Sequence, residues 1–233
     1  MSHDQPRNPS LVVPLPDAAL ARRGWKLVVD GVGVPEVRHL CLAHPEYGAV
    51  TYGLTPAGHD GWSFRETGGG GVVILPFVAI DGELLVGVVE QIRPLQGGQV
   101  LNAPRGFARA EELRLDAARR ELAEETGLEL AGDELVRLPG APANPNSAFF
   151  ETGPDRGVEF FAARLAPGRL VRDEVGWKLA SAPDGGFSRE QQEEMIQELR
   201  FVAWSDAAVL GDMFTNAAVA RLLAWRKQEG SSP

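Results

Sequence analysis

Between residues 106 and 128 the sequence places four glutamates at fixed spacing behind a turn glycine, and this pattern limits the possible folds more than any other. The glycine is Gly106, and the carboxylates are Glu112, Glu121, Glu124 and Glu125. Apolar residues recur at helical spacing over residues 111–126, and Gly127 follows as a residue that ends helices. We therefore expect one helix over 111–126 that carries all four glutamates.

The expected helix has an apolar side and an acidic border. The apolar stripe consists of Leu115, Ala118 and Leu122. Glu121 and Glu125 are four residues apart, so they stand one above the other along the border of this stripe. On the opposite side we expect Asp116 to pair with Arg120. The alternative interpretation is an ordinary acidic surface helix, but such a helix does not require this spacing.

Glu124 lies beside this pair, so three carboxylates converge near the C-terminal half of the helix. Like charges repel at such distances, and here they also meet the negative end of the helix dipole. A bound cation would relieve both effects. Oxygen ligands suit Mg²⁺ or Mn²⁺, and neither His nor Cys lies near enough in the sequence to indicate zinc. Gly106 permits a tight turn, so the carbonyl of Arg105 can face the same ion.

A β-hairpin is the clearest element outside this helix. Residues 72–80 form a continuous apolar run, Asp81 and Gly82 supply a two-residue turn, and residues 83–89 return. We therefore expect a central, largely buried hairpin. Pro76 lacks a backbone N–H, so it requires an edge position or a bulge.

The sequence predicts three parts in the chain. Residues 1–16 are expected to form a disordered or loosely docked arm. Residues 17–67 are expected to form a small antiparallel β-region, with strands at 25–34, 35–42 and 49–52. Residues 56–71 form a predicted loop. Residues 68–233 then make the main domain.

The rest of the main domain alternates between strands and helices. Strands are expected at 158–165 and 199–204, loops at 95–110 and 179–192, and a final helix at 205–227. Candidates for the buried side of the final helix are Val209, Met213, Val219, Leu222 and Leu223. The order of strands, helix, strands and helix indicates an α+β fold rather than a doubly wound array.

Composition excludes several classes of protein. The formal net charge is -9 and the 233 residues contain no run of Lys and Arg, so a nucleic-acid partner is not expected. Cys41 is the single cysteine, which rules out an intrachain disulfide framework and a cysteine-based zinc site. No window reaches ~18 uninterrupted apolar residues, so no membrane span is expected. Residues 1–16 lack the pattern of a signal peptide, and we expect a cytoplasmic protein.

Residues 106–128 match the signature of the Nudix hydrolases, including its Arg-Glu-aliphatic-x-Glu-Glu core, and the chain resembles that family. The resemblance implies an α/β/α sandwich with a mixed sheet, a loop-helix-loop site for Mg²⁺ or Mn²⁺, and hydrolysis of a nucleoside diphosphate linked to another moiety. Glu112 resembles the outlying acidic position that pairs with the arginine, here Arg120. The implied metal ligands are Glu121, Glu125, Glu124 and the carbonyl of Arg105.

The flanking residues are similar to one branch of this family, the ADP-ribose pyrophosphatases. Residues 88–94 resemble the strand that ends in a Gln-aromatic-Arg triplet, and residues 101–106 resemble the loop that enters the signature. The chain departs from that pattern at Ile92, which replaces the aromatic residue, and at Arg105, which replaces a small residue. Prolines near residue 145 are suggestive of the same branch.

The branch resemblance implies a substrate and a partner. The substrate would be ADP-ribose or a related nucleotide sugar, cleaved to a nucleoside monophosphate and a sugar phosphate. A guanidinium can hold a terminal phosphate with two hydrogen bonds. The substrate-binding candidates are Arg93, Arg105 and Gly106. The N-terminal β-region resembles the extension through which this branch forms homodimers.

The family resemblance implies that the general base is either a glutamate of the signature or a glutamate on a loop before the last strand, and the choice stays open. Candidates on that loop are Glu190, Glu193 and Glu194. Two other functions also stay open. One is a non-catalytic nucleotide-sensing module with the same fold, and the other is an enzyme for a different substrate, such as a dinucleotide or a nucleoside triphosphate.

Overall fold

The computed structural model describes four strands near the N-terminus and four longer segments. The described ranges are 26–30, 39–44, 48–54, 60–66, 70–93, 98–142, 157–180 and 196–230. The arm expected at residues 1–16 lies outside them. Within the described segments, no helix combines the length and the apolar character needed to cross a membrane.

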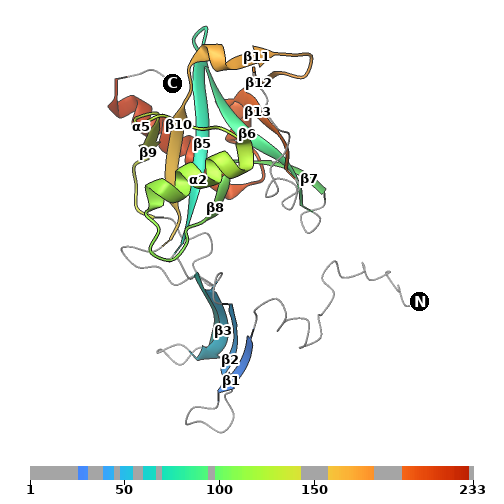
Figure 1. Cartoon of the computed structure of the whole chain (residues 1–233), viewed down its shortest axis with the longest axis vertical. Coiled ribbons are helices and arrows are strands. Elements are labelled where there is room, and N and C mark those ends of the chain that lie inside the picture. The colour runs from blue at the N-terminus through green and yellow to red at the C-terminus, as the bar shows by residue number, and fades with distance from the viewer. Residues whose placement is uncertain are drawn as a thin grey trace, which may run out of the picture.

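The N-terminal strands form an antiparallel sheet of their own (Figure 1). In spatial order they are β1 (Lys26–Asp30), β2 (His39–His44), β3 (Gly48–Leu54) and β4 (Asp60–Glu66). The first three agree with the predicted strands. The predicted loop at 56–71 is wrong for residues 60–66, where Trp62 and Phe64 supply a two-residue period that the nearby glycines obscure. Pairing along the whole of β3 then makes this segment a strand.

The main domain is built on a mixed nine-stranded sheet in the order β11-β12-β13-β6-β5-β10-β9, with β7 paired to β6 and β8 paired to β5. Its strands are β5 (Gly71–Ile80), β6 (Glu83–Arg93), β7 (Gly98–Asn102), β8 (Arg105–Phe107), β9 (Leu135–Arg137), β10 (Glu159–Arg164), β11 (Leu170–Arg172), β12 (Trp177–Leu179) and β13 (Ile196–Ala203). The β5–β10 pair is parallel, and the other pairs of described strands in this sheet are antiparallel. The predicted loop at 95–110 is wrong where it contains β7 and β8.

The central hairpin is confirmed, and its proline has a specific place. Asp81 and Gly82 both have positive φ, at 51° and 85°, as a primed two-residue turn requires. Pro76 lies in a central strand rather than at an edge. It sits on β5 between the part that pairs with β8 and the part that pairs with β6, so no ladder hydrogen bond needs its missing N–H there. Gly87 makes room for the ring, because a Cβ at that position would lie 2.9 Å from Pro76.

Helices cover both faces of this sheet, with α2 in front and α5 behind in Figure 1. The described helices are α2 (Arg114–Thr126), α4 (Trp204–Ala207), α5 (Met213–Gln228) and the 3-10 turn η2 (Pro167–Arg169). Alternate residues of β5 point to opposite faces: Val72 and Ile74 pack with Leu122 of α2, and Val73 and Leu75 pack with α5. Each such buried aliphatic side chain contributes roughly 1.5–3 kcal/mol. The expected α+β sandwich with a mixed sheet is confirmed.

Both predicted helices have different limits in the structure. Helix α2 begins at Arg114 rather than at 111, because Glu111 has a φ of 60° and cannot continue a right-handed helix. Leu115, predicted to be buried, is 38% exposed. The final helical segment is divided into α4 and α5, and the predicted core residues Val209 and Met213 lie at that division with 81% and 75% exposure. Val219 and Leu222 are buried as predicted.

Candidate active site

Helix α2 carries three of the four glutamates, and two of these lie on its buried side. Glu121 and Glu125 are only 8% and 5% exposed, although Ala118 and Leu122 form the apolar side between the helix and the sheet. The two glutamates are four residues apart and therefore share a face. A charge at such depth is costly unless it is paired or hydrogen-bonded. The partners of these carboxylates therefore decide what the site can do.

Arg120 binds the glutamates together. Its Nε and Nη2 donate to the two oxygens of Glu112, each at 2.9 Å, which is a bidentate ion pair. Its Nη1 donates to Glu121 Oε1 at 2.7 Å and to Glu124 Oε2 at 2.8 Å. The predicted pair between Asp116 and Arg120 is wrong. Asp116 Oδ1 instead lies 4.0 Å from Arg119 Nη1 on the exposed side of α2, because Arg120 pairs with the glutamates.

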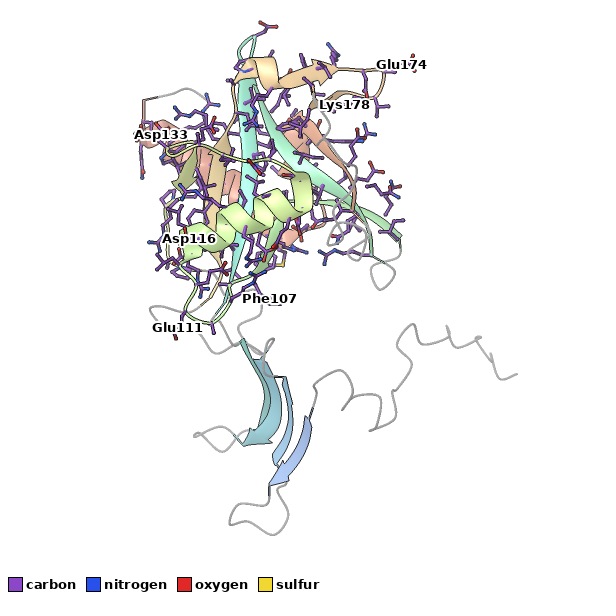
Figure 2. All side chains as sticks on the ribbon, viewed as in Figure 1. Phe107, Glu111, Asp116, Asp133, Glu174 and Lys178 are labelled. Carbon is purple, nitrogen blue, oxygen red and sulfur yellow. The ribbon has the colours of Figure 1, made fainter. Side chains whose placement is uncertain are left out.

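The loop before α2 closes around this guanidinium. Phe107 accepts a further hydrogen bond from Arg120 Nη2 through its carbonyl, at 2.9 Å. Glu112 also accepts from the backbone N–H of Arg109, at 2.8 Å. Hydrogen bonding from Arg120 is the largest cause that lowers the pKa of Glu112 from 4.5 to about 2. Figure 2 shows Phe107 and Glu111 together at the lower end of the main domain, where this loop turns.

The segment that precedes the loop contacts both buried glutamates. The backbone N–H of Arg105 donates to Glu125 Oε2 at 3.1 Å. At Gly106, an added Cβ would lie 2.1 Å from the carboxylate carbon of Glu121. Real Cβ atoms essentially never approach within 3.0 Å of such a group, so any larger residue at this position would displace the Glu121 carboxylate. The glycine and the two glutamates of the sequence pattern are thus brought together.

The side chain of Arg105 points away from the glutamates. Its Nη1 lies 2.6 Å from Asp212 Oδ1, and its guanidinium lies 5.0 Å from the centre of the Phe214 ring. Both partners belong to the start of α5. Arg105 therefore meets Glu125 through its backbone N–H, whereas the sequence predicts its carbonyl at the ion. Its side chain connects β8 to the opposite layer of the sandwich.

Comparison with known proteins identifies the family to which this arrangement belongs. A model of the NUDIX domain matches residues 70–223, more than half of the 233 residues. The chain belongs to the Nudix family. It is a Nudix hydrolase, as the glutamate spacing predicts. The matched region contains the hairpin, α2 and most of α5.

Solved structures with a similar fold are distant in sequence. The structure of an ADP compounds hydrolase is 14% identical, with a TM-score of 0.48, and the match covers 88% of this chain and 96% of that one. A NUDIX hydrolase from Listeria monocytogenes is 19% identical, with a TM-score of 0.41, over 70% of this chain and 97% of that one. No curated protein matches the chain.

Nudix enzymes generally use divalent metals, and the donors of this site suit such ions. All the candidate side chains offer carboxylate oxygens, which Mg²⁺ and Mn²⁺ prefer. Among the described residues, however, no group of three or more His, Cys, Asp or Glu side chains is already arranged to hold an ion. Glu124 is 28% exposed and contacts both Arg120 and Arg109. The donor types fit a metal.

Four further candidates from the sequence lie elsewhere in the chain: Arg93 and three loop glutamates. Arg93 ends β6, and its Nε donates to Gln91 Oε1 at 2.7 Å. Gln91 is 5% exposed, so the arginine is held by a buried amide. The general-base candidates of the loop before the last strand lie outside the described residues. They are Glu190, Glu193 and Glu194.

Sequence reasoning missed the residue before α5 that holds the side chain of Arg105. Asp212 caps α5, because its Oδ2 accepts from the backbone N–H of Thr215 at 2.9 Å. An aspartate before an amphipathic segment is a known signal for a helix start, so this position could have been found. Its ion pair with Arg105 could not, because it joins residues 107 positions apart.

Proposed function

We propose that this chain hydrolyses the diphosphate bond of a nucleoside diphosphate linked to another moiety, with bound Mg²⁺ or Mn²⁺. One observation carries the proposal: two buried glutamates, Glu121 and Glu125, share one face of α2 against a glycine and a backbone amide of the adjoining strand. Hard divalent cations suit such oxygen donors, and hydrolysis of a diphosphate needs positive charge at the phosphoryl oxygens.

Each residue of the cluster has a separate task in this proposal. A bound divalent ion would stabilise the developing charge on the phosphoryl oxygens and acidify a water. Glu121 and Glu125 would hold it, with the Arg105 carbonyl and Glu124 as further ligands. Arg120 keeps the carboxylates of Glu121 and Glu124 close together without the ion. Glu112 holds Arg120 by a bidentate ion pair. The general base is Glu124 or one of the loop candidates Glu190, Glu193 and Glu194.

We further propose ADP-ribose or a related nucleotide sugar as the substrate. The sequence similarity at residues 88–94 and 101–106 supports this choice. Arg93 is suited to bind the terminal phosphate, because a guanidinium offers two parallel donors to one phosphate group. The buried Gln91 limits where its Nε can point. The expected products are a nucleoside monophosphate and a sugar phosphate.

The N-terminal sheet is a candidate dimerisation region. We propose that residues 17–67 mediate a homodimer and that residues 68–233 form the catalytic domain. The four strands β1 to β4 make a sheet separate from that of the main domain, which supports such a division. We also propose a cytoplasmic location, which suits a chain with Cys41 as its single cysteine.

A substrate panel tests the proposed reaction. The purified chain is incubated with Mn²⁺ and, in separate reactions, ADP-ribose, other nucleotide sugars, a dinucleotide and nucleoside triphosphates. Formation of AMP and a sugar phosphate from ADP-ribose, faster than cleavage of the other compounds, supports the proposal. Faster cleavage of a dinucleotide or a triphosphate would favour the alternative enzyme, and Mn²⁺ binding without turnover of any compound would favour a sensing module.

A further inference from the structure

The short segment from Ala103 to Arg105 is held by three different parts of the main domain. The N–H of Ala103 donates to Thr215 Oγ1 of α5 at 2.7 Å. The carbonyl of Pro104 accepts from Ile74 of β5 at 2.8 Å. The N–H of Arg105 donates to Glu125 of α2 at 3.1 Å. Three successive residues therefore connect α5, the sheet and the glutamate helix.

The connection to α5 has two parts that meet at Asp212. Oδ2 of Asp212 accepts from the backbone N–H and the hydroxyl of Thr215, at 2.9 and 2.6 Å. Its Oδ1 accepts from Arg105 Nη1 at 2.6 Å. Thr215 is fully buried, and the side chains of Arg105 and Asp212 are each only 17% exposed. An ion pair with this geometry and burial is stronger than an exposed one, and its loss leaves an unpaired charge.

The same segment also decides where the two buried glutamates can lie. Glu125 is hydrogen-bonded to the amide of Arg105, and Glu121 has its carboxylate against Gly106, where an added methyl group would displace it. A displacement of the segment by about 1 Å would therefore shift both carboxylates. Helix α5 could affect them in this way although it supplies none of the proposed metal ligands. Metal-ligand distances tolerate only about 0.2 Å.

We propose that Asp212 and Thr215 are positioning residues of the glutamate site, which act by clamping residues 103–105 to the start of α5. This inference rests on the proposed function, since the readout is the metal affinity of Glu121 and Glu125. This role explains why the chain has Arg105 where the related pattern has a small residue. The long side chain reaches Asp212, and a small residue could not. Groups that orient ligands typically change metal affinity 10–100-fold when removed.

The test compares two substitutions of Thr215, one that removes its hydroxyl and one that keeps it. Thr215→Val keeps the shape of the side chain but leaves the Ala103 N–H without its acceptor, whereas Thr215→Ser keeps the acceptor. Mn²⁺ affinity is measured on the metal-free chain by calorimetry, and thermal unfolding is measured in parallel. We expect Thr215→Val to weaken Mn²⁺ binding by about 10-fold and Thr215→Ser to stay within about 2-fold of wild type.

Two more variants separate positioning from general stability. Arg105→Gln breaks the clamp at a partly exposed ion pair, and we expect it to fold and to weaken Mn²⁺ binding in the same direction. Arg221→Gln is the matched control, because Arg221 also ties α5 to a loop, through the carbonyls of Pro139 and Ala141. We expect it to lower the unfolding temperature without changing Mn²⁺ affinity.

The outcomes distinguish the two proposals. If wild type binds Mn²⁺ and folded Thr215→Val and Arg105→Gln both keep its affinity, the positioning role is overturned while the proposed function stands. Weaker binding in Arg221→Gln to the same extent as in Thr215→Val would also overturn it, since metal affinity would then report stability alone. A wild-type chain that binds no Mn²⁺ would contradict the proposed function itself.

Discussion

The space between Gly106 and Glu121 allows one substitution to be worked out in detail. In Gly106→Ala, the new Cβ would lie 2.1 Å from the carboxylate carbon of Glu121, and ordinary contact begins at 3.4 Å. The carboxylate must therefore move by at least about 1.3 Å, which is 3.4 minus 2.1. No positive φ is required at Gly106, so the change probes space rather than backbone strain.

The expected consequence is a loss of metal affinity larger than the loss of stability. A shift of about 1.3 Å is several times the tolerance of about 0.2 Å on a metal-ligand distance, so Glu121 is lost as a ligand. We expect Mn²⁺ affinity to fall at least about 10-fold and turnover at least about 100-fold. Overpacking itself costs about 1–3 kcal/mol of unfolding free energy, which leaves the domain folded.

Calorimetry with Mn²⁺ and chemical denaturation measure these two effects separately. Gly132→Ala is the control, because nothing lies within 4 Å of a Cβ at that position. We expect this control to match wild type in both measurements. A folded Gly106→Ala variant with wild-type Mn²⁺ affinity would refute the reasoning, because Glu121 could then not be a ligand from its position against this glycine.

Three further predictions concern single residues. Glu125→Gln removes the charge of the most deeply buried glutamate of the site, and we expect kcat to fall by at least ~10²-fold. The control is Glu129→Gln, at an exposed position, which should keep wild-type kinetics. Equal activity of the two variants would contradict the ligand role of Glu125. Because Arg120 holds the pKa of Glu112 at about 2, below its ordinary 4.5, this pair stabilises the fold above pH 4.5 and the contribution is lost as the pH falls towards 2. After allowance for solvent screening we expect Glu112→Gln to cost about 1–2 kcal/mol near neutral pH, with a smaller difference from wild type at about pH 3 in denaturant titrations; a difference independent of pH would count against the assignment. Arg93→Ala should raise KM for ADP-ribose at least about 10-fold with a smaller change in kcat, as loss of ground-state binding does, and a fall in kcat at constant KM would assign Arg93 a different role.

The elements that the sequence predicts correctly have local causes. The hairpin follows from an Asp-Gly pair between two apolar runs, and the structure places positive φ at both turn residues. The end of α2 follows from Gly127, which has a φ of 70° and returns its N–H to Ala123. These features depend on residues that are neighbours in the sequence, so the sequence alone contains the information.

The errors arise where the sequence pattern does not show which partner a segment meets. Residues 111–113 have a helical pattern, but Glu112 is taken by Arg120 and Glu111 turns with positive φ, so α2 starts later. Val209 and Met213 fit a helical period, yet they lie where α4 and α5 separate and face solvent. Periodicity describes one continuous helix and cannot reveal such a division.

The site itself shows the same limit. Its glutamates and glycine are identified by their spacing within one segment of the chain. The pairing of Arg105 with Asp212 depends on how β8 and α5 meet across the sheet, and no short-range pattern reports that. The sequence therefore predicts the candidate site residues, and the structure adds the contacts that surround them.

The central claim is that Glu121 and Glu125 hold a divalent cation, and anomalous diffraction from crystals grown with Mn²⁺ tests it most directly. The account predicts a manganese peak within coordination distance, about 2.0–2.3 Å, of carboxylate oxygens from both residues, with Glu124 turned away from Arg120. A manganese ion bound elsewhere in the molecule, or no bound ion at concentrations that support turnover, would contradict the account.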